Sequence, residues 1–301
     1  MNYRIIKLGS ITIPLILTAV IAVIPLFVES EVLIRTVGSS ATEGEIWYTN
    51  PYDYSSYFIG KTGTSGLGSL AKDDSGTLYS VNHDGELVTI NVETGEATII
   101  ATITGIDTSG RAYVSIRGLT FGQDGTLYAV HSDPTSSYVE DMLYTIDPND
   151  GSASLIGGLS YVGVQALTTG PDGTIYAYDN GHYEYSARLI IIDPQTGEIT
   201  DVDPDDNEIG GGWTQSLAFD SNGVLYGVGA GVLSVDIDPD TGETSGVWGS
   251  ISPWSGGEGS EFAYKLVPSI FLHRYLLGAI GIIWASGIAA YFLFRRKRSD
   301  D

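Results

Sequence analysis

Short apolar runs alternate with glycine-containing polar turns through most of the chain. Four segments share one pattern in which a glycine separates a polar residue from an apolar run: DSGTLYSV at 74–81, QDGTLYAV at 123–130, PDGTIYAY at 171–178 and SNGVLYGV at 221–228. Successive glycines of this pattern lie 49, 48 and 50 residues apart. Asp-Gly and Asn-Gly supply the positive φ angles of a tight turn, and an apolar stretch around Leu70, Leu119, Leu167 or Leu217 precedes each one. Each segment therefore predicts an antiparallel hairpin.

A second hairpin follows each of the first four. The four segments read LVTINVETGEATII from Leu87, LYTIDPNDGSASLIG from Leu143, LIIIDPQTGEIT from Leu189 and LSVDIDPDTGET from Leu233. In three of them a proline fixes φ just after a strand, and a glycine completes the turn. A unit of about 48 residues with four short strands is thus repeated along the chain.

The repeat predicts an all-β architecture, because a single four-stranded sheet with two apolar faces must stack on its neighbours. A closed β-propeller is the usual arrangement for units of this length. Residues 46–60 (IWYTNPYDYSSYFIG) match the second hairpin at 143–157, and residues 259–264 (GSEFAY) resemble the first hairpin. We therefore expect five blades in residues 45–264, the last shared between the two chain ends, with a linker at residues 31–44.

Both ends of the chain carry apolar segments typical of membrane or export signals. Residues 1–30 have two basic residues before an uncharged stretch, which predicts a signal peptide or an N-terminal anchor. Residues 275–294 lack charge and precede Arg295, Arg296, Lys297 and Arg298, which predicts a transmembrane helix with a cytoplasmic tail at residues 295–301. Residues 265–274 would be the juxtamembrane segment, and the propeller would lie outside the cytoplasm.

The charge of the chain is divided between these parts. The formal net charge is −23, from 14 Lys plus Arg against 37 Asp plus Glu. Residues 31–264 hold 6 of the basic and 34 of the acidic residues, a net charge of 6 − 34 = −28. Such a domain repels a phosphate backbone, so nucleic-acid binding is excluded. Cysteine is absent, which excludes disulfides and thiolate chemistry.

The repeat resembles extracellular β-propeller repeats of the NHL and YVTN type, over about 220 residues. This resemblance implies a scaffold and no particular chemistry. The C-terminal region is loosely similar to bacterial Val-Pro-Glu-Pro sorting tails, through Val267-Pro268 and the basic cluster. Ser269 and Ile270 stand where Glu-Pro would be expected, so we expect a retained anchor rather than a processed tail.

Candidate chemistry lies in the loops after the second strand of each blade, which meet at one face of a propeller. Three histidines fall there, His83, His131 and His182. They would hold a divalent cation with an open position for water, or provide a general base; some propeller lyases similar to this repeat use loop histidines with a divalent cation. Alternatively, these are ordinary polar loop residues.

Further candidates are acidic and aromatic. The ligand-binding candidates are Asp84, Asp133, Asp179, Tyr183 and Tyr185. Alternating carboxylates at Asp201, Asp203 and Asp205 are a candidate cation loop, although a solvated acidic turn is the simpler interpretation.

Two functions follow from the sequence. The first is a membrane-anchored, surface-exposed acidic propeller that acts as a binding or structural module for an extracellular ligand, protein or glycan. The alternative is a lyase or hydrolase assisted by a divalent metal at the loop histidines. The sequence leaves the cofactor open, and catalysis is the less favoured of the two functions.

Overall fold

The computed structural model describes the residues of a five-sheet domain. These are residues 27–37, 43–51, 53–106, 114–131, 140–160, 163–179, 188–202, 214–229, 232–243, 249–251 and 259–268. The chain divides into one unit at residues 31–264 and a second unit formed by residues 1–30 and 265–301. The predicted signal peptide, the predicted transmembrane helix and the basic tail lie wholly or largely outside the described residues. Within the described part of the chain, no helix reaches the length and hydrophobicity of a membrane span.

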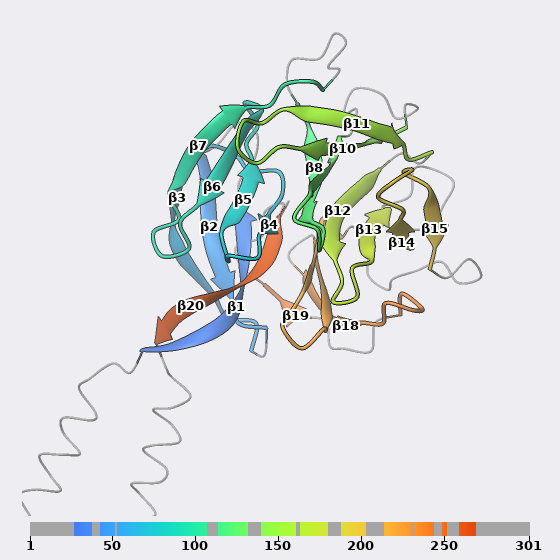
Figure 1. Cartoon of the computed structure of the whole chain (residues 1–301). Helices are drawn as coiled ribbons and strands as arrows, with labels where there is room; N and C mark the ends of the chain where they lie inside the picture. Colours follow the sequence, from blue (N-terminus) through green and yellow to red (C-terminus); the bar gives the residue numbers. More distant parts are fainter. Residues whose placement is uncertain are drawn as a thin grey trace, which may run out of the picture. The chain divides into compact units, whose positions relative to one another are not determined.

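Five four-stranded antiparallel sheets form the blades, which confirms the predicted all-β propeller (Figure 1). Blade 2 contains β4 (Ala71–Lys72), β5 (Leu78–Val81), β6 (Glu86–Ile90) and β7 (Ala97–Thr102). Blade 3 contains β8 (Ile116–Phe121), β9 (Leu127–His131), β10 (Met142–Ile146) and β11 (Ala153–Gly158). Blade 4 contains β12 (Val164–Thr169), β13 (Ile175–Asp179), β14 (Arg188–Ile192) and β15 (Ile199–Asp201). Blade 5 contains β16 (Ser216–Phe219), β17 (Leu225–Gly229), β18 (Val232–Ile237) and β19 (Gly249–Ser250).

The remaining blade, here called the closing blade, combines both chain ends. Its strand order is β20-β1-β2-β3, from β20 (Ser260–Pro268), β1 (Phe27–Val37), β2 (Glu43–Thr49) and β3 (Ser56–Ser65). Residues 31–37 therefore belong to a strand and not to the expected linker, and the C-terminal end supplies one strand where a hairpin was expected. Because β20 and β1 come from opposite chain ends, no turn joins them. The Asp-Gly signature of the other first hairpins is therefore missing.

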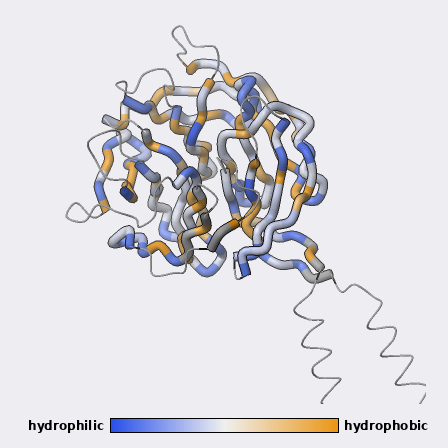
Figure 2. Tube along the Cα trace, turned by 180° about the vertical axis from the view of Figure 1, so that it is seen from behind, coloured by the Kyte–Doolittle hydropathy of each residue, from blue (hydrophilic) through white to orange (hydrophobic). Residues whose placement is uncertain are grey.

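Apolar side chains fill the space between successive sheets. One cluster joins blades 3 and 4 through Tyr128, Val130 and Leu167, and another joins blade 5 to the closing blade through Tyr226, Leu33 and Phe262. Figure 2 shows apolar positions interspersed with polar ones along the trace of the domain. Buried residues on both faces of strands such as β9 and β13 explain why each sheet needs a neighbour on both sides.

The described turns confirm the predicted hairpin chemistry. Gly76, Gly125, Gly173 and Gly223 all have positive φ angles, between 78° and 90°. In blades 3 and 4, the aspartate before the glycine accepts hydrogen bonds from the threonine after it. Asp124 and Asp172 each accept one from the backbone N–H and one from the hydroxyl of Thr126 and Thr174. These bonds hold the pKa of both carboxyl groups below the usual value.

Candidate binding site at the central channel

The inner strands of the five blades, with the residues that immediately precede β4 and β20, line one cavity on the propeller axis. In four blades a small residue precedes a leucine, and in the closing blade Gly259 precedes Ser260; the pairs are Ser69-Leu70, Gly118-Leu119, Ala166-Leu167 and Ser216-Leu217. Arg117 completes the lining. The cavity has a volume of about 10 Å³, which is room for about one water molecule.

Close approach of the inner strands requires the small residues. A Cβ atom on Gly118 would lie 2.8 Å from Cγ of Leu167, and one on Gly259 would lie 2.5 Å from the backbone carbon of Ser69. Larger side chains at these positions would push neighbouring blades apart. The pattern of a small residue before leucine is visible in the sequence. Its part in lining the cavity becomes clear only when the strands are arranged around the axis.

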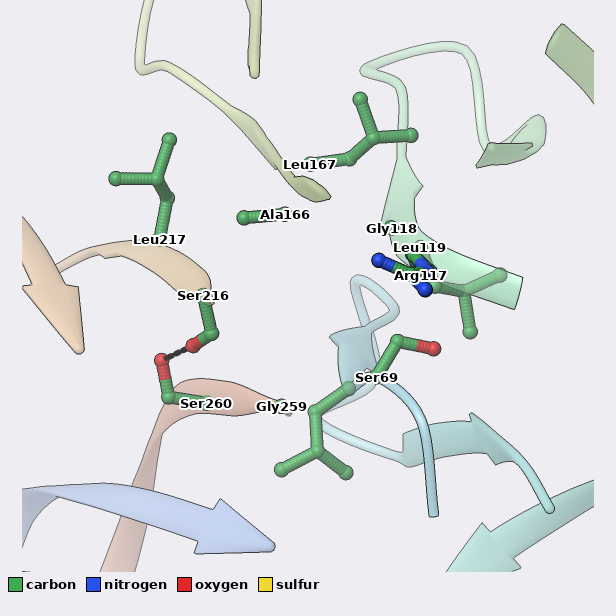
Figure 3. Close-up of a pocket in the computed structure, with 11 residues that line it drawn as sticks. Ser69, Arg117, Gly118, Leu119, Ala166, Leu167, Ser216, Leu217, Gly259 and Ser260 are labelled. Atoms are coloured by element: carbon green, nitrogen blue, oxygen red, sulfur yellow. Dashed lines mark hydrogen bonds between the residues drawn. The ribbon is translucent and has the colours of Figure 1, made fainter. Parts of the chain in front are cut away.

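Two irregularities in the inner strands shape the cavity wall. The pairing of β8 with β9 shifts between Ile116 and Gly118, at Arg117, and the pairing of β12 with β13 shifts at Ala166, whose φ is 56°. Bulges of this kind redirect side chains at the rims of barrels and beside functional sites. Figure 3 shows the Arg117 guanidinium directed into the cavity from this position in β8.

Arg117 and Ser69 direct polar groups into the same space (Figure 3). Ser69 is 2% exposed, and its hydroxyl makes no hydrogen bond to another described residue. No ion pair or hydrogen bond joins the Arg117 guanidinium to any residue in the described ranges. On the opposite wall the hydroxyls of Ser216 and Ser260 bond to each other. The cavity thus presents one guanidinium and one buried hydroxyl as donors.

The loops that follow the second strand of each blade begin beside the end of the inner strands at which Arg117 lies. His83 donates its backbone N–H to the carbonyl of Gly66 at 2.9 Å. His131 is the register partner of Ile116, and Asp179 is the register partner of Val164. His83, His131 and Asp179 therefore lie at the same end of their blades as Arg117.

His83 and Asp84 lie in a tight turn that is organised by Asn82. The Asn82 carboxamide oxygen accepts hydrogen bonds from the N–H groups of Asp84 at 3.0 Å and Glu86 at 2.8 Å. Its amide nitrogen donates to Thr64 Oγ1 at 2.7 Å. Asp84 is exposed and His83 is partly buried. Asn82 was missed in the sequence because its role depends on contacts across the turn.

His131 occupies a strand and not a loop. It is the last residue of β9 and is 2% exposed, and its ring lies perpendicular to that of Tyr144, with 6.2 Å between ring centroids. The loop position assigned to it from sequence is therefore wrong, because the strand extends one residue beyond the apolar run. Among the described residues no three His, Asp or Glu side chains are grouped closely enough to hold a metal ion. His182 lies outside the described residues, so the three-histidine site stays a prediction.

Arg188 joins two of the candidate carboxylates. Its Nη1 lies 2.5 Å from Oδ2 of Asp201, and its Nε lies 3.6 Å from Oδ2 of Asp179. Arg188 and Asp179 are also register partners in β14 and β13. These carboxylates already have a protein cation beside them. The remaining candidates lie outside the described residues: Asp133, Tyr183, Tyr185, Asp203 and Asp205.

A second ion pair lies next to the cavity, at the seam between the closing blade and blade 2. Lys72 Nζ is 3.5 Å from Oε1 of Glu261 and also donates to the carbonyl of Phe262. Burial raises the pKa of the Glu261 carboxyl, and the positive charge of Lys72 opposes this rise.

No protein-family model and no curated protein matches this chain. Several solved structures resemble it in fold. A chain of a nidogen–laminin complex is 13% identical, with a TM-score of 0.49, over 79% of this chain and 86% of that chain. A putative gluconolactonase is 13% identical, with a TM-score of 0.46, over 80% and 95%. A calcium-binding regucalcin from Agrobacterium tumefaciens is 16% identical, with a TM-score of 0.45, over 77% of each. These similarities concern the fold alone.

Proposed function

We propose that this protein is a binding module, a five-bladed propeller that receives a ligand at the channel and is held outside the cytoplasm by a C-terminal anchor. The observation that carries the binding role is the cavity lined by the inner edges of all five blades, where Arg117 and Ser69 present donors that no other described residue accepts. A guanidinium and a buried hydroxyl that find no acceptor in the described part of the chain are donors that can orient a bound molecule or ion.

The anchoring part of the proposal is supported by sequence. Residues 275–294 carry no charge and are followed by four consecutive basic residues, which remain in the cytoplasm under the positive-inside rule. The net charge of −28 on residues 31–264 also suits a domain that faces outward. An extracellular small molecule, protein or glycan is the expected class of partner.

The absence of cysteine allows a direct test of this orientation. Two single-cysteine variants of the full-length chain, Asp74→Cys in the exposed turn between β4 and β5 and Ser299→Cys in the basic tail, are treated with a membrane-impermeant maleimide on spheroplasts. We expect Asp74→Cys to be labelled on intact spheroplasts and Ser299→Cys only after the membrane is permeabilised. The cysteine-free wild type is the blank.

Two outcomes of the labelling experiment would contradict the proposal. Labelling of Ser299→Cys on intact spheroplasts would indicate the opposite orientation of the protein in the membrane. Recovery of the whole protein in the soluble fraction after carbonate extraction would show that it is not anchored in the membrane.

A further inference from the structure

We infer that the N-terminal apolar segment, residues 8–26, stays on the mature chain as a second membrane span, so that the lipid bilayer holds the propeller by both chain ends. The inference rests on the anchor proposed above and adds a second contact with the membrane. It depends on three observations: the pairing of β1 with β20, the position of the predicted cleavage point within β1, and the charges beside the two apolar segments.

The first observation is that β1 and β20 bring the two ends of the domain together. They are hydrogen-bonded neighbours in the closing blade and run in opposite directions (Figure 1). The backbone N–H of Thr36 in β1 donates to the carbonyl of Gly259, just before β20 begins. Counted from this contact, nine residues lead back to Phe27 and nine lead on to Pro268. Because the rise per residue is nearly constant in strands, the start of β1 lies beside the end of β20.

Both apolar segments of the chain join the domain at this pair of strand ends. Residues 8–26 carry no charge and lead directly into β1, and six residues separate Pro268 from the predicted transmembrane helix at 275–294. Residues 1–30 and 265–301 also form one unit of the chain. A helix of 19 residues would be about 28 Å long, which suits a hydrocarbon core of about 30 Å. Two such segments that start from adjacent strand ends enter the same bilayer from the same side.

The second observation is that the predicted leader extends into a strand of the folded domain. Val28 and Ser30 would supply the cleavage pattern of a signal peptide, with the cut after Ser30, but β1 already begins at Phe27. Strand β2 pairs with residues 33–37 of β1, so the first residues of β1 have β20 as their neighbour. The facing part of β20 includes Lys265, which is 7% exposed. Cleavage would therefore remove hydrogen-bond partners from a largely buried stretch of backbone.

The third observation is that the charges beside both apolar segments favour one arrangement. Arg4 and Lys7 precede the N-terminal segment, and Glu29 and Glu31 follow it. The C-terminal segment is followed by the basic cluster at residues 295–298. Basic residues that flank a span remain in the cytoplasm. Two spans with the propeller between them place both basic flanks in the cytoplasm and the acidic domain outside.

The first test is the intact mass of the full-length protein, extracted from membranes in a non-ionic detergent. We expect the wild type to retain residues 8–30 and thus nearly the whole mass of 32.1 kDa. The matched control is Ser30→Tyr, which places a large side chain where signal peptidase requires a small one and so prevents the cut. The wild type and this variant should differ in mass only by the substituted side chain.

The second test locates the N-terminus with Asn2→Cys in the otherwise cysteine-free chain. Spheroplasts are treated with the membrane-impermeant maleimide, as for the two cysteine variants described above. We expect Asn2→Cys to escape labelling on intact spheroplasts and to be labelled after the membrane is permeabilised. Asp74→Cys, in an exposed turn of the propeller, is the control for a position outside the membrane.

Two results would overturn the inference. A wild type that lacks residues 1–30, while Ser30→Tyr retains them, would show that the segment is a cleaved signal peptide. Labelling of Asn2→Cys on intact spheroplasts would show that the N-terminal segment does not cross the membrane. Neither result changes the labelling expected for Asp74→Cys and Ser299→Cys, which tests the C-terminal anchor. Failure of the second span is therefore distinguished from failure of the proposed function.

Discussion

At the scale of single residues, the glycines serve two different physical purposes. Gly63 and Gly76 adopt φ angles of 73° and 86°, and an added Cβ atom would meet nothing within 4 Å. Gly60 has ordinary dihedral angles, yet a Cβ atom there would lie 1.8 Å from the carbonyl oxygen of Thr94 in blade 2. The first kind supplies backbone freedom, and the second allows the closing blade and blade 2 to approach.

This distinction predicts different costs for the same substitution within strand β3. Gly60→Ala forces two blades apart and should lower the free energy of unfolding by about 3 kcal/mol, as overpacking does. Gly63→Ala meets open space and should cost about 1 kcal/mol through its positive φ alone. Chemical denaturation of the full-length variants measures both values. Equal losses would show that the contact between Gly60 and Thr94 does not limit the packing of the blades.

At the scale of strands and blades, the sequence predicted the repeated hairpins and the blade shared by the two chain ends, but it missed strand β1 of that blade. The Asp-Gly turns that mark the first hairpins encode local geometry, so the chain pattern alone reveals them. Strand β1 has no turn linking it to β20, and its pairing depends on a segment more than 200 residues away. The channel residues were missed for a related reason, since Ser69 and Arg117 become neighbours only after the blades form a ring.

The seam between the closing blade and blade 2 contains the Lys72–Glu261 pair, whose side chains are 32% and 15% exposed. Partly buried ion pairs are often no more stable than apolar residues of similar size, because desolvation offsets their attraction. We expect the double variant Lys72→Met and Glu261→Leu to unfold at pH 7 with a free energy equal to or about 1 kcal/mol above that of wild type. Glu261→Leu alone should be less stable than wild type, because it leaves Lys72 without its carboxylate. Chemical denaturation of the wild type, the double variant and Glu261→Leu measures the three free energies of unfolding. A double variant less stable than Glu261→Leu would contradict the prediction.

The same seam predicts a pH dependence with a definite sign. Because burial raises the pKa of Glu261 above the ordinary value of 4.5 for a glutamate, the folded protein retains this proton at pH values where the unfolded chain has lost it. The contribution of Glu261 to stability is therefore fully present below that value and decreases as pH rises through the raised pKa. Glu261→Gln cannot titrate, so its stability relative to wild type should increase between about pH 4 and pH 7. Denaturation midpoints across this range test the prediction, and a constant difference would contradict it.

At the scale of the whole domain, ring closure is achieved without a covalent link. Strand β20 contacts both neighbouring blades, through Ser260 and Ser216 of blade 5 and through Phe262 and Lys72 of blade 2. The backbone N–H of Thr36 in β1 also donates to the carbonyl of Gly259 at 2.9 Å. The two ends of the domain thus hold the ring together, and the chain contains no cysteine that could form a disulfide for this purpose.

This arrangement can be tested with a disulfide at the position where the ring closes. Ser216 and Ser260 lie opposite each other on β16 and β20, 44 residues apart in sequence, with their hydroxyls in contact. In an otherwise cysteine-free chain, Ser216→Cys combined with Ser260→Cys should form one internal disulfide and raise the free energy of unfolding by about 3 to 4 kcal/mol. The gain should vanish on reduction and be absent in either single variant. Denaturation with and without reductant measures it, together with non-reducing electrophoresis. Disulfides that form only between molecules would mean that β16 and β20 are not neighbours, so the ring would not close as described.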